Sequence, residues 1–256
     1  MAPRGAATKP AATAHSVHRN LGCAGCAPRR SGHCAPVTRG RFITLEGGEG
    51  VGKSTQAAIL TEHLQSLGIE VLRTREPGGS ENAEAVRDLV VKGDAGRWSP
   101  VAETLLMYAA RADHLERLIR PALERGAWVV CDRFADSTRA YQGAGGGVAP
   151  AVIEGIDAAV VGADQPDLTL VFDLPVEIGL ERAFGRDMFE ARFESKGQDF
   201  HRRLREHFLA IAKAEPQRCQ VIDAAGDPDA VASAVWTTVA GRFPELEGRQ
   251  RSEGHG

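Results

Sequence analysis

Eight residues near the start of the chain have the spacing of a phosphate-binding loop. Residues 47–54 read Gly-Gly-Glu-Gly-Val-Gly-Lys-Ser, follow an apolar run at 42–45 and precede a helical pattern, which is the context that makes this motif specific. Glycines let backbone N–H groups surround a phosphate, and the helix adds the positive end of its dipole. Lys53 can reach the β- and γ-phosphates of a nucleotide. The predicted ATP-binding residues of this loop are Gly47, Gly48, Glu49, Gly50, Val51, Gly52, Lys53, Ser54 and Thr55.

A second chemical signal follows the apolar run at 127–131, which leads directly into Asp132-Arg133-Phe134. An acid at the end of such a strand can hold Mg²⁺ directly or through water, and a P-loop serine hydroxyl is a common second ligand. Ser54 and Asp132 are therefore the predicted metal ligands, and Arg133 suits a second phosphate. The alternative is that Asp132 caps the next helix, with Arg133 as its ion-pair partner, but the upstream phosphate loop favours the metal and phosphate site.

Five β-type runs separated by helical patterns must position these residues. The runs occupy 42–46, 69–73, 127–131, 168–173 and 219–222. One helix is predicted from about Lys53 to Leu67, ending before Gly68, and another begins at Pro100. This alternation predicts an α/β fold with a five-stranded parallel sheet and helices on both faces. Such sheets bind ligands beyond the carboxyl ends of their strands.

The first part of the chain differs in composition from the rest. Residues 1–41 are rich in Ala, Gly, Pro and Arg and contain no acid, so 1–38 are predicted to be a disordered basic leader. The cluster Cys23, Cys26, His33 and Cys34 could bind zinc, although the adjacent His-Cys pair has poor ligand spacing. The predicted domain covers 39–243, and 244–256 form a flexible tail.

Overall charge and hydropathy do not point to a nucleic acid or membrane partner. The net charge is −3, which gives no indication of nucleic acid or membrane binding. The leader lacks the apolar core of a secretory signal, and no apolar run reaches the ~18 residues that span a bilayer. A cytoplasmic protein without a nucleic acid or membrane partner is expected.

Four segments identify a family. They are Thr-Arg-Glu-Pro-Gly-Gly at 74–79, Tyr-Ala-Ala-Arg at 108–111, Asp132-Arg133-Phe134, and Ser-Thr-Arg-Ala-Tyr-Gln-Gly at 137–143. With the phosphate loop, they make the chain resemble bacterial-type thymidylate kinases from about Arg41 to Phe243. The resemblance implies the P-loop nucleoside monophosphate kinase fold, a homodimer, and transfer of the γ-phosphoryl group of MgATP to dTMP, giving dTDP for dTTP synthesis. Two alternatives stay open, another nucleoside monophosphate kinase and a non-catalytic, nucleotide-gated P-loop protein.

The same resemblance implies roles for individual residues. Glu49 would approach the deoxyribose 3′-hydroxyl, and Arg87 and Arg133 would bind the dTMP phosphate. Arg111, Thr138 and Gln142 would read the edge of thymine. Met107 stands where the family usually has Phe. The resemblance therefore does not identify the side chain that stacks on thymine. The expected substrate-binding residues are Glu49, Pro77, Arg87, Met107, Arg111, Arg133, Ser137, Thr138, Tyr141 and Gln142.

Residues 181–199 resemble the lid of these kinases. Arg182 and Arg186 are spaced i, i+4 and share a helical face. The P-loop carries no arginine. The chain therefore resembles the type of thymidylate kinase whose catalytic arginines come from the lid. Arg186 is then the main transition-state cation, Arg182 lies near ATP, and Arg192 supports them. The expected catalytic residues are Lys53, Asp132, Arg133, Arg182 and Arg186.

Other basic residues in helical segments carry no predicted chemistry. An apolar stripe through 200–211 predicts an amphipathic helix. Its basic residues are expected on the outer face: His201, Arg202, Arg203, Arg205 and His207. His63 and His114 are expected to be ordinary helix residues.

Overall fold

The computed structural model describes residues 38–92, 96–183, 196–246 and 248–249. Almost all of the predicted leader, including the possible zinc cluster at Cys23, Cys26, His33 and Cys34, lies outside these residues. The predicted lid residues Arg186 and Arg192 also lie outside them. The packed region continues past the predicted domain end at Phe243, because the Leu246 side chain is fully buried.

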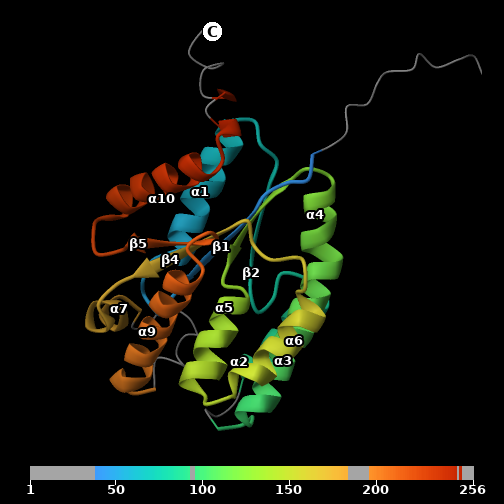
Figure 1. The fold of residues 1–256 in the computed structure, drawn as a ribbon, viewed down its shortest axis with the longest axis vertical. Helices are drawn as coiled ribbons and strands as arrows, with labels where there is room; N and C mark the ends of the chain where they lie inside the picture. The colour runs from blue at the N-terminus through green and yellow to red at the C-terminus, as the bar shows by residue number, and fades with distance from the viewer. Residues whose placement is uncertain (1–37, 93–95, 184–195, 247, 250–256) are drawn as a thin grey trace, which may run out of the picture. The chain divides into compact units, whose positions relative to one another are not determined.

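Five parallel strands form one sheet in the order β2-β3-β1-β4-β5 (Figure 1). They are β1 (Phe42–Gly47), β2 (Val71–Arg75), β3 (Trp128–Asp132), β4 (Leu168–Asp173) and β5 (Cys219–Asp223). The predicted α/β fold is thus confirmed. Strand β2 begins two residues later than predicted, because the Ile69 N–H donates to Leu64 O at the end of the preceding helix and so does not join the sheet.

Helices connect the strands. They are α1 (Lys53–Ser66), α2 (Glu81–Val91), α3 (Pro100–His114), η1 (Leu115–Ile119), α4 (Arg120–Glu124), α5 (Ala135–Thr138), η2 (Arg139–Gly145), α6 (Pro150–Val160), α7 (Val176–Ala183), α9 (Gln198–Ala214) and α10 (Pro228–Arg242). The predicted caps are confirmed: Gly68, with φ 69°, follows the end of α1, and Pro100 begins α3 after Ser99, whose hydroxyl accepts from Ala102 N–H at 3.3 Å.

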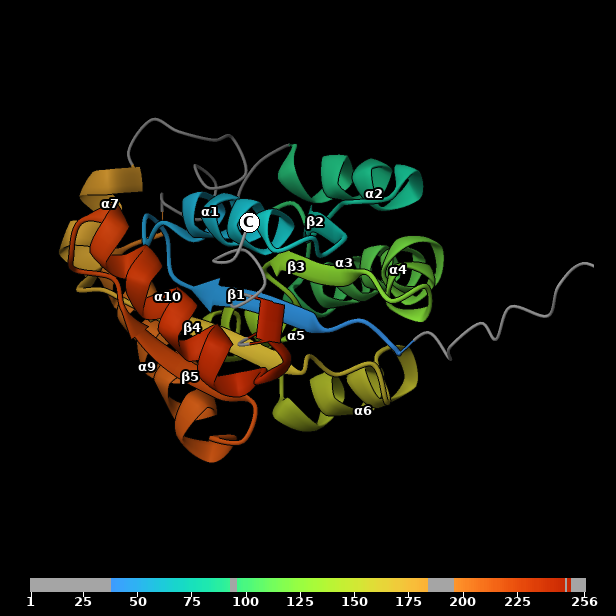
Figure 2. The ribbon, with the colours of Figure 1, turned by 90° about the horizontal axis from the view of Figure 1, so that it is seen from above.

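Helices cover both faces of the sheet (Figure 2). Helices α1 and α10 pack on one face, and α4, α5 and α9 pack on the other. Strands β1 and β4 are buried on both faces, which is why their sequences are nearly continuous apolar runs. Within the described ranges, no helix has both the length and the apolar character that crossing a bilayer requires.

Candidate active site

Three neighbouring strands deliver the predicted site residues to one edge of the sheet. Strand β1 runs into the phosphate loop, β3 ends at Asp132, and β2 leads into Glu76. Backbone hydrogen bonds tie these ends together, since Glu76 N–H donates to Asp132 O and Arg133 N–H donates to Leu45 O, both at 2.9 Å. The site therefore lies beyond the carboxyl ends of the strands, as parallel α/β sheets require.

The phosphate loop is shaped by glycines and held closely by its neighbours. A side chain at Gly50, which has φ 67°, would collide with the carbonyl oxygen of Gly179 in α7. This close approach explains why the loop carries no arginine at that position. Lys53 is 5% exposed, and its Nζ donates to Gly47 O at 3.2 Å and to Gly48 O at 2.6 Å. The ammonium group is thus turned back over the loop, where a bound phosphate would lie.

Ser54 and Asp132, the predicted metal ligands, are in direct contact. The Ser54 hydroxyl donates to Asp132 Oδ2 at 2.5 Å, whereas the buried Oδ1 has no hydrogen-bond partner among the described residues. A carboxylate oxygen that lacks a partner beside a serine hydroxyl fits a hard cation such as Mg²⁺, which takes few protein ligands and completes its shell with phosphate oxygens and water.

Arg133 and Glu49 form a buried ion pair between the phosphate loop and the acceptor side. Arg133 has φ 68°, in the left-handed region, which only a well-determined environment sustains for a residue other than glycine. Its Nη2 lies 2.8 Å from Glu49 Oε2 and its Nη1 donates to Gly47 O at 3.0 Å. Burial alone would raise the pKa of Glu49, but the charges of Arg133 and Lys53 outweigh it, and the pKa lies below its ordinary value. Glu49 is therefore an anion.

A pocket of about 360 Å³ brings together most of the residues predicted to bind the acceptor. Arg111 lines this pocket. Its Nε donates to Glu76 Oε2 at 2.7 Å and its Nη2 donates to Thr138 Oγ1 at 3.0 Å. Its buried Nη1 has no hydrogen-bond partner in the described part of the chain. We call this space the acceptor pocket; it is lined by Glu76, Pro77, Met107, Arg111, Arg133, Phe134, Ser137, Thr138, Tyr141 and Gln142.

Three buried acids support the acceptor pocket but were not predicted as site residues, although Glu76 belongs to a segment that identified the family. Glu76 holds Arg111, and Glu103 accepts from Gln142 Nε2 at 2.8 Å. Glu46 accepts from Ser137 Oγ at 2.6 Å, and burial, reinforced by the nearby Asp136 charge, raises its pKa to about 7. Their partners lie 35 to 91 positions away in the chain, so local patterns do not reveal them.

Of Phe134, Tyr108 and Arg87, only Phe134 lines the acceptor pocket. Phe134 lines the pocket, whereas the Tyr108 hydroxyl donates to Asp157 Oδ1 at 3.0 Å and Tyr108 is not among the lining residues. Arg87 does not line the pocket either. Its Nη1 donates to Pro77 O at 2.9 Å, which holds it next to a residue that lines the pocket.

On the other side of the phosphate loop lies a larger space, of about 840 Å³, which we call the donor pocket. Arg182 reaches it from α7 and donates through Nη1 to Ala224 O at 3.1 Å. The lining residues are Gly50, Val51, Gly52, Thr55, Gln56, Arg182, Ala224, Gly226, Asp227, Pro228 and Val231. The donor pocket thus borders the phosphate loop directly, whereas the acceptor pocket is connected to the loop through the ion pair of Arg133 with Glu49.

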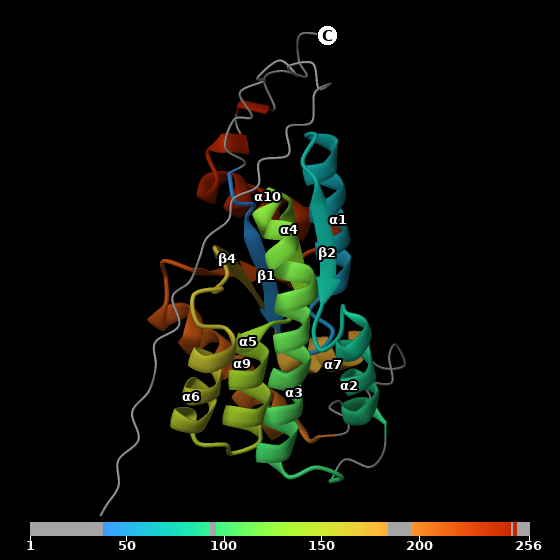
Figure 3. The same ribbon diagram turned by 90° about the vertical axis from the view of Figure 1, so that its right-hand side faces the viewer.

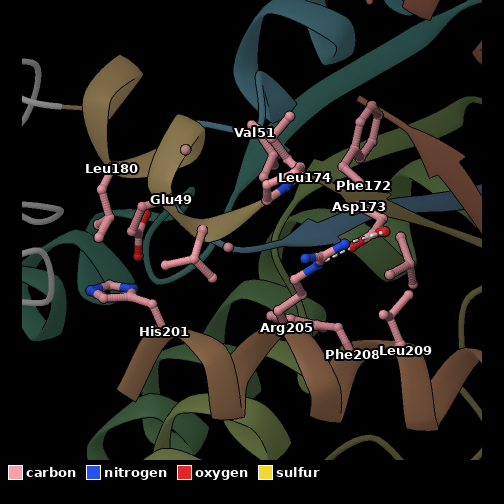
Figure 4. Close-up of a pocket in the computed structure, with 15 residues that line it drawn as sticks. Glu49, Val51, Phe172, Asp173, Leu174, Leu180, His201, Arg205, Phe208 and Leu209 are labelled. Atoms are coloured by element: carbon pink, nitrogen blue, oxygen red, sulfur yellow. Dashed lines mark hydrogen bonds and ion pairs between the residues drawn. The ribbon is translucent and has the colours of Figure 1, made fainter. Parts of the chain in front are cut away.

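A third pocket lies behind Glu49 and corrects one expectation (Figure 4). His201 on α9 faces Glu49 and is only 4% exposed, so it does not occupy the outer face of the helix. Arg205 lines the same pocket and forms two hydrogen bonds to Asp173, at 2.6 and 3.0 Å. The predicted apolar stripe of 200–211 is confirmed, and Arg202 and Arg203 are exposed as expected, whereas His201 is buried and Arg205 and His207 are partly covered.

Comparisons with known proteins agree with this geometry. The family model of thymidylate kinase matches residues 45–235. The thymidylate kinase of Caulobacter vibrioides is 58% identical over 207 residues, which cover 81% of this chain and 99% of that protein. The thymidylate kinase of Nitrobacter winogradskyi is 53% identical over 210 residues, which cover 81% and 91%.

A solved structure is similar as well. The crystal structure of thymidylate kinase from Ehrlichia chaffeensis matches with a TM-score of 0.64 and 32% identity, over 78% of this chain and 99% of that chain. Neither of the two alternatives left open by the sequence finds support in these comparisons. The chain therefore belongs to the thymidylate kinase family and is an enzyme of the nucleoside monophosphate kinase class.

Proposed function

We propose that the two pockets beside the phosphate loop carry out the thymidylate kinase reaction, transfer of the γ-phosphoryl group of ATP to dTMP, which yields dTDP and ADP. The observation that carries the proposal is Arg111, which lines the acceptor pocket and whose buried Nη1 has no partner among the described residues. A guanidinium N–H donor fits a carbonyl oxygen at the edge of thymine. These substrates also favour a cytoplasmic location for the enzyme.

On the donor side, the loop residues 47–55 bind the phosphates of ATP, and Lys53 supplies a fixed cation at the β- and γ-phosphates. Ser54 and Asp132 would hold Mg²⁺, which, when bound, neutralises charge on the phosphate oxygens. Arg182 borders the donor pocket and contacts ATP from α7. Arg186 and Arg192 lie outside the described residues, and their role as lid cations is part of this proposal.

On the acceptor side, Arg133 is a cation held between the phosphate loop and the acceptor pocket, and with Arg87 it binds the dTMP phosphate. Glu49 is the anion that accepts from the deoxyribose 3′-hydroxyl. Phosphoryl transfer asks little covalent chemistry of the protein, so holding two phosphates in line with cations around them supplies most of the rate enhancement. Base recognition belongs to Arg111 and to its neighbours Thr138 and Gln142.

A panel of nucleoside monophosphates tests this function. With ATP and Mg²⁺, the purified protein should phosphorylate dTMP well ahead of dGMP, dCMP and dAMP, because the acceptor pocket offers donors matched to the thymine edge. Chelation by EDTA should abolish turnover and added Mg²⁺ should restore it. Equal rates on all four acceptors, or none on dTMP, would refute the proposal; activity that survives EDTA would refute its metal site alone.

We also propose that the enzyme is a homodimer joined through the outer surfaces of α2, α3 and α6, which lie side by side (Figure 3). These helices expose large apolar side chains, which in this proposal form one patch: Leu89, Val101, Leu105 and Val152, each 41 to 53% exposed. Exposed apolar side chains gathered on adjacent elements mark an interaction surface. A second copy of the chain is the occupant that buries the same patch twice.

Val101→Glu should therefore shift the protein from dimer to monomer, because it places a charge in the centre of an apolar interface. Val221→Glu is a matched control, since Val221 is 49% exposed against 47% for Val101 but lies on β5, away from the patch. Sedimentation velocity over a concentration series measures both. Equal association of the two variants would show that this surface does not form the dimer.

A further inference from the structure

Behind Arg111 lies a buried chain of hydrogen bonds that the proposed function does not use. Thr74 Oγ1, at the end of β2, lies 2.8 Å from His114 Nε2. His114 Nδ1 lies 3.0 Å from Glu76 Oε1, and Glu76 Oε2 accepts from Arg111 Nε at 2.7 Å. His114 is fully buried and Glu76 is 4% exposed. His114 is therefore not an ordinary helix residue but the middle of a connected polar chain.

The chemistry of the chain gives each bond a direction. An ionised carboxylate only accepts hydrogen bonds, so the His114 Nδ1–H donates to Glu76 and Glu76 accepts from Arg111. In the neutral ring, Nε2 then accepts from the Thr74 hydroxyl; in the charged ring, Nε2–H donates to it. Both forms satisfy every ring nitrogen. Each Glu76 oxygen thus has its own donor, which fixes the plane of the carboxylate.

A fixed Glu76 carboxylate fixes the guanidinium of Arg111. The Arg111 guanidinium also lies between two rings, 4.6 Å from the centre of Tyr108 and 5.1 Å from that of Phe134. Its Nε and Nη2 are occupied by protein acceptors, and only Nη1 lacks one among the described residues. The orientation of the guanidinium, and with it the direction of the Nη1–H bonds, consequently depends on Glu76 together with the acceptors of Nη2.

We propose that Thr74 and His114 act through Glu76 as positioning residues that aim Arg111 Nη1 at the base of the acceptor nucleotide. This inference rests on the proposed base-reading role of Arg111 and extends it beyond the pocket wall. It joins residues from β2, from the segment that follows it and from α3, none of which contacts the moving phosphoryl group.

A glycine provides separate evidence for this arrangement. Gly79 has φ 92°, and a Cβ at this position would collide with both His114 Nε2 and Thr74 Oγ1. The second glycine of the Thr-Arg-Glu-Pro-Gly-Gly segment thus leaves the space in which the threonine–histidine contact forms. The segment that identified the family also builds this support for Arg111.

The test compares Thr74→Val, which keeps the shape but loses the hydroxyl, with Thr74→Ser, which restores it. One lost hydrogen bond corresponds to about a three- to tenfold change in binding, so Thr74→Val should raise the dTMP Kd by this factor and Thr74→Ser should recover it. The kcat at saturating dTMP and the KM for ATP should change by less than about twofold. Thr61→Val is the control, because it removes a buried threonine hydroxyl that, in the described part of the chain, bonds only within α1, to Ala57 O.

A second pair of variants tests the histidine. In His114→Asn the amide can occupy the place of Nδ1 and keep the bond to Glu76, whereas His114→Leu keeps neither bond. The dTMP Kd should therefore increase in the order wild type, His114→Asn, His114→Leu, and discrimination between dTMP and dCMP should decrease in the same order. Thermal unfolding of each variant, with and without dTMP, shows whether the protein remains folded.

The possible outcomes separate this inference from the function on which it rests. Unchanged dTMP binding in Thr74→Val and His114→Leu, together with weakened binding in Arg111→Ala, would overturn the inference and leave the base-reading role intact. A parallel loss of kcat or ATP binding would indicate a general structural role and would also overturn it. Unchanged dTMP binding in Arg111→Ala would instead overturn the proposed role of Arg111 itself.

Discussion

Replacement of Lys53 by alanine is expected to lower kcat by about 10²–10³, which is the usual cost of removing one preorganised charge stabiliser from an active site. In the structure the Lys53 ammonium group is held over the phosphate loop by the carbonyl oxygens of Gly47 and Gly48. It is therefore in place before the nucleotide binds, and no reorganisation is needed as charge develops on the transferring group. The KM for dTMP should change far less than kcat.

The measurement is steady-state kinetics with ATP and dTMP, accompanied by circular dichroism. Lys92→Ala is a matched control because Lys92, at the end of α2, pairs among the described residues with Asp88 alone, one turn earlier, and its side chain is 60% exposed. This control should keep normal turnover. If Lys53→Ala retained normal turnover as well, the ammonium group would have no part in stabilising the phosphates.

Arg111→Ala should show the opposite kinetic pattern, a large loss of dTMP binding with a smaller effect on kcat at saturation. A hydrogen bond that involves a charged group is worth about 1.5–3 kcal/mol, equivalent to roughly 10- to 150-fold in dTMP Kd. Preference for dTMP over the other monophosphates should fall, because Arg111 contacts the base and not the transferring phosphoryl group. Calorimetric titration of dTMP and the acceptor panel measure both effects.

The same substitution should lower stability, since it leaves the buried Glu76 carboxylate without its arginine. Arg111→Lys keeps the charge near Glu76 but loses the planar fork that reaches Thr138. It should therefore unfold at a higher temperature than Arg111→Ala and still bind dTMP poorly. Tight dTMP binding in Arg111→Lys would mean that charge alone, rather than the orientation of the guanidinium, determines recognition of the base.

The parts of the site that could be predicted from the sequence are those whose chemistry is local. The phosphate loop is a run of consecutive residues, so the order of its glycines already determines its shape, and Ser54 follows Lys53 directly. The contact between Ser54 and Asp132 was also predictable, because strands that end at the same edge of a parallel sheet bring their next residues together. Strand β4 also has the predicted bounds, because a strand that is buried on both faces is one continuous apolar run.

Other features could not be read from local patterns. The start of β2 depends on a hydrogen bond from Ile69 to the end of α1, which competes with the sheet for the same N–H group. His201 lies in an amphipathic helix whose pattern alone places it outside, but packing of α9 against the sheet buries it beside Glu49. Periodicity shows which residues of a helix are apolar, and it does not show how far the neighbouring elements cover the flanks.

The sequence by itself determined the α/β fold and the family, and it predicted the phosphate loop and the residues proposed to contact the two nucleotides, because each depends on residue types at short, regular spacing. Only the tertiary structure decided which acids support them. Glu46, Glu76 and Glu103 are buried charged or polar groups, and burial is stable only where partners from distant elements satisfy them. Satisfying Glu76 in this way brings Thr74, on a strand, into contact with His114, at the end of a helix. No local pattern in the chain encodes this contact.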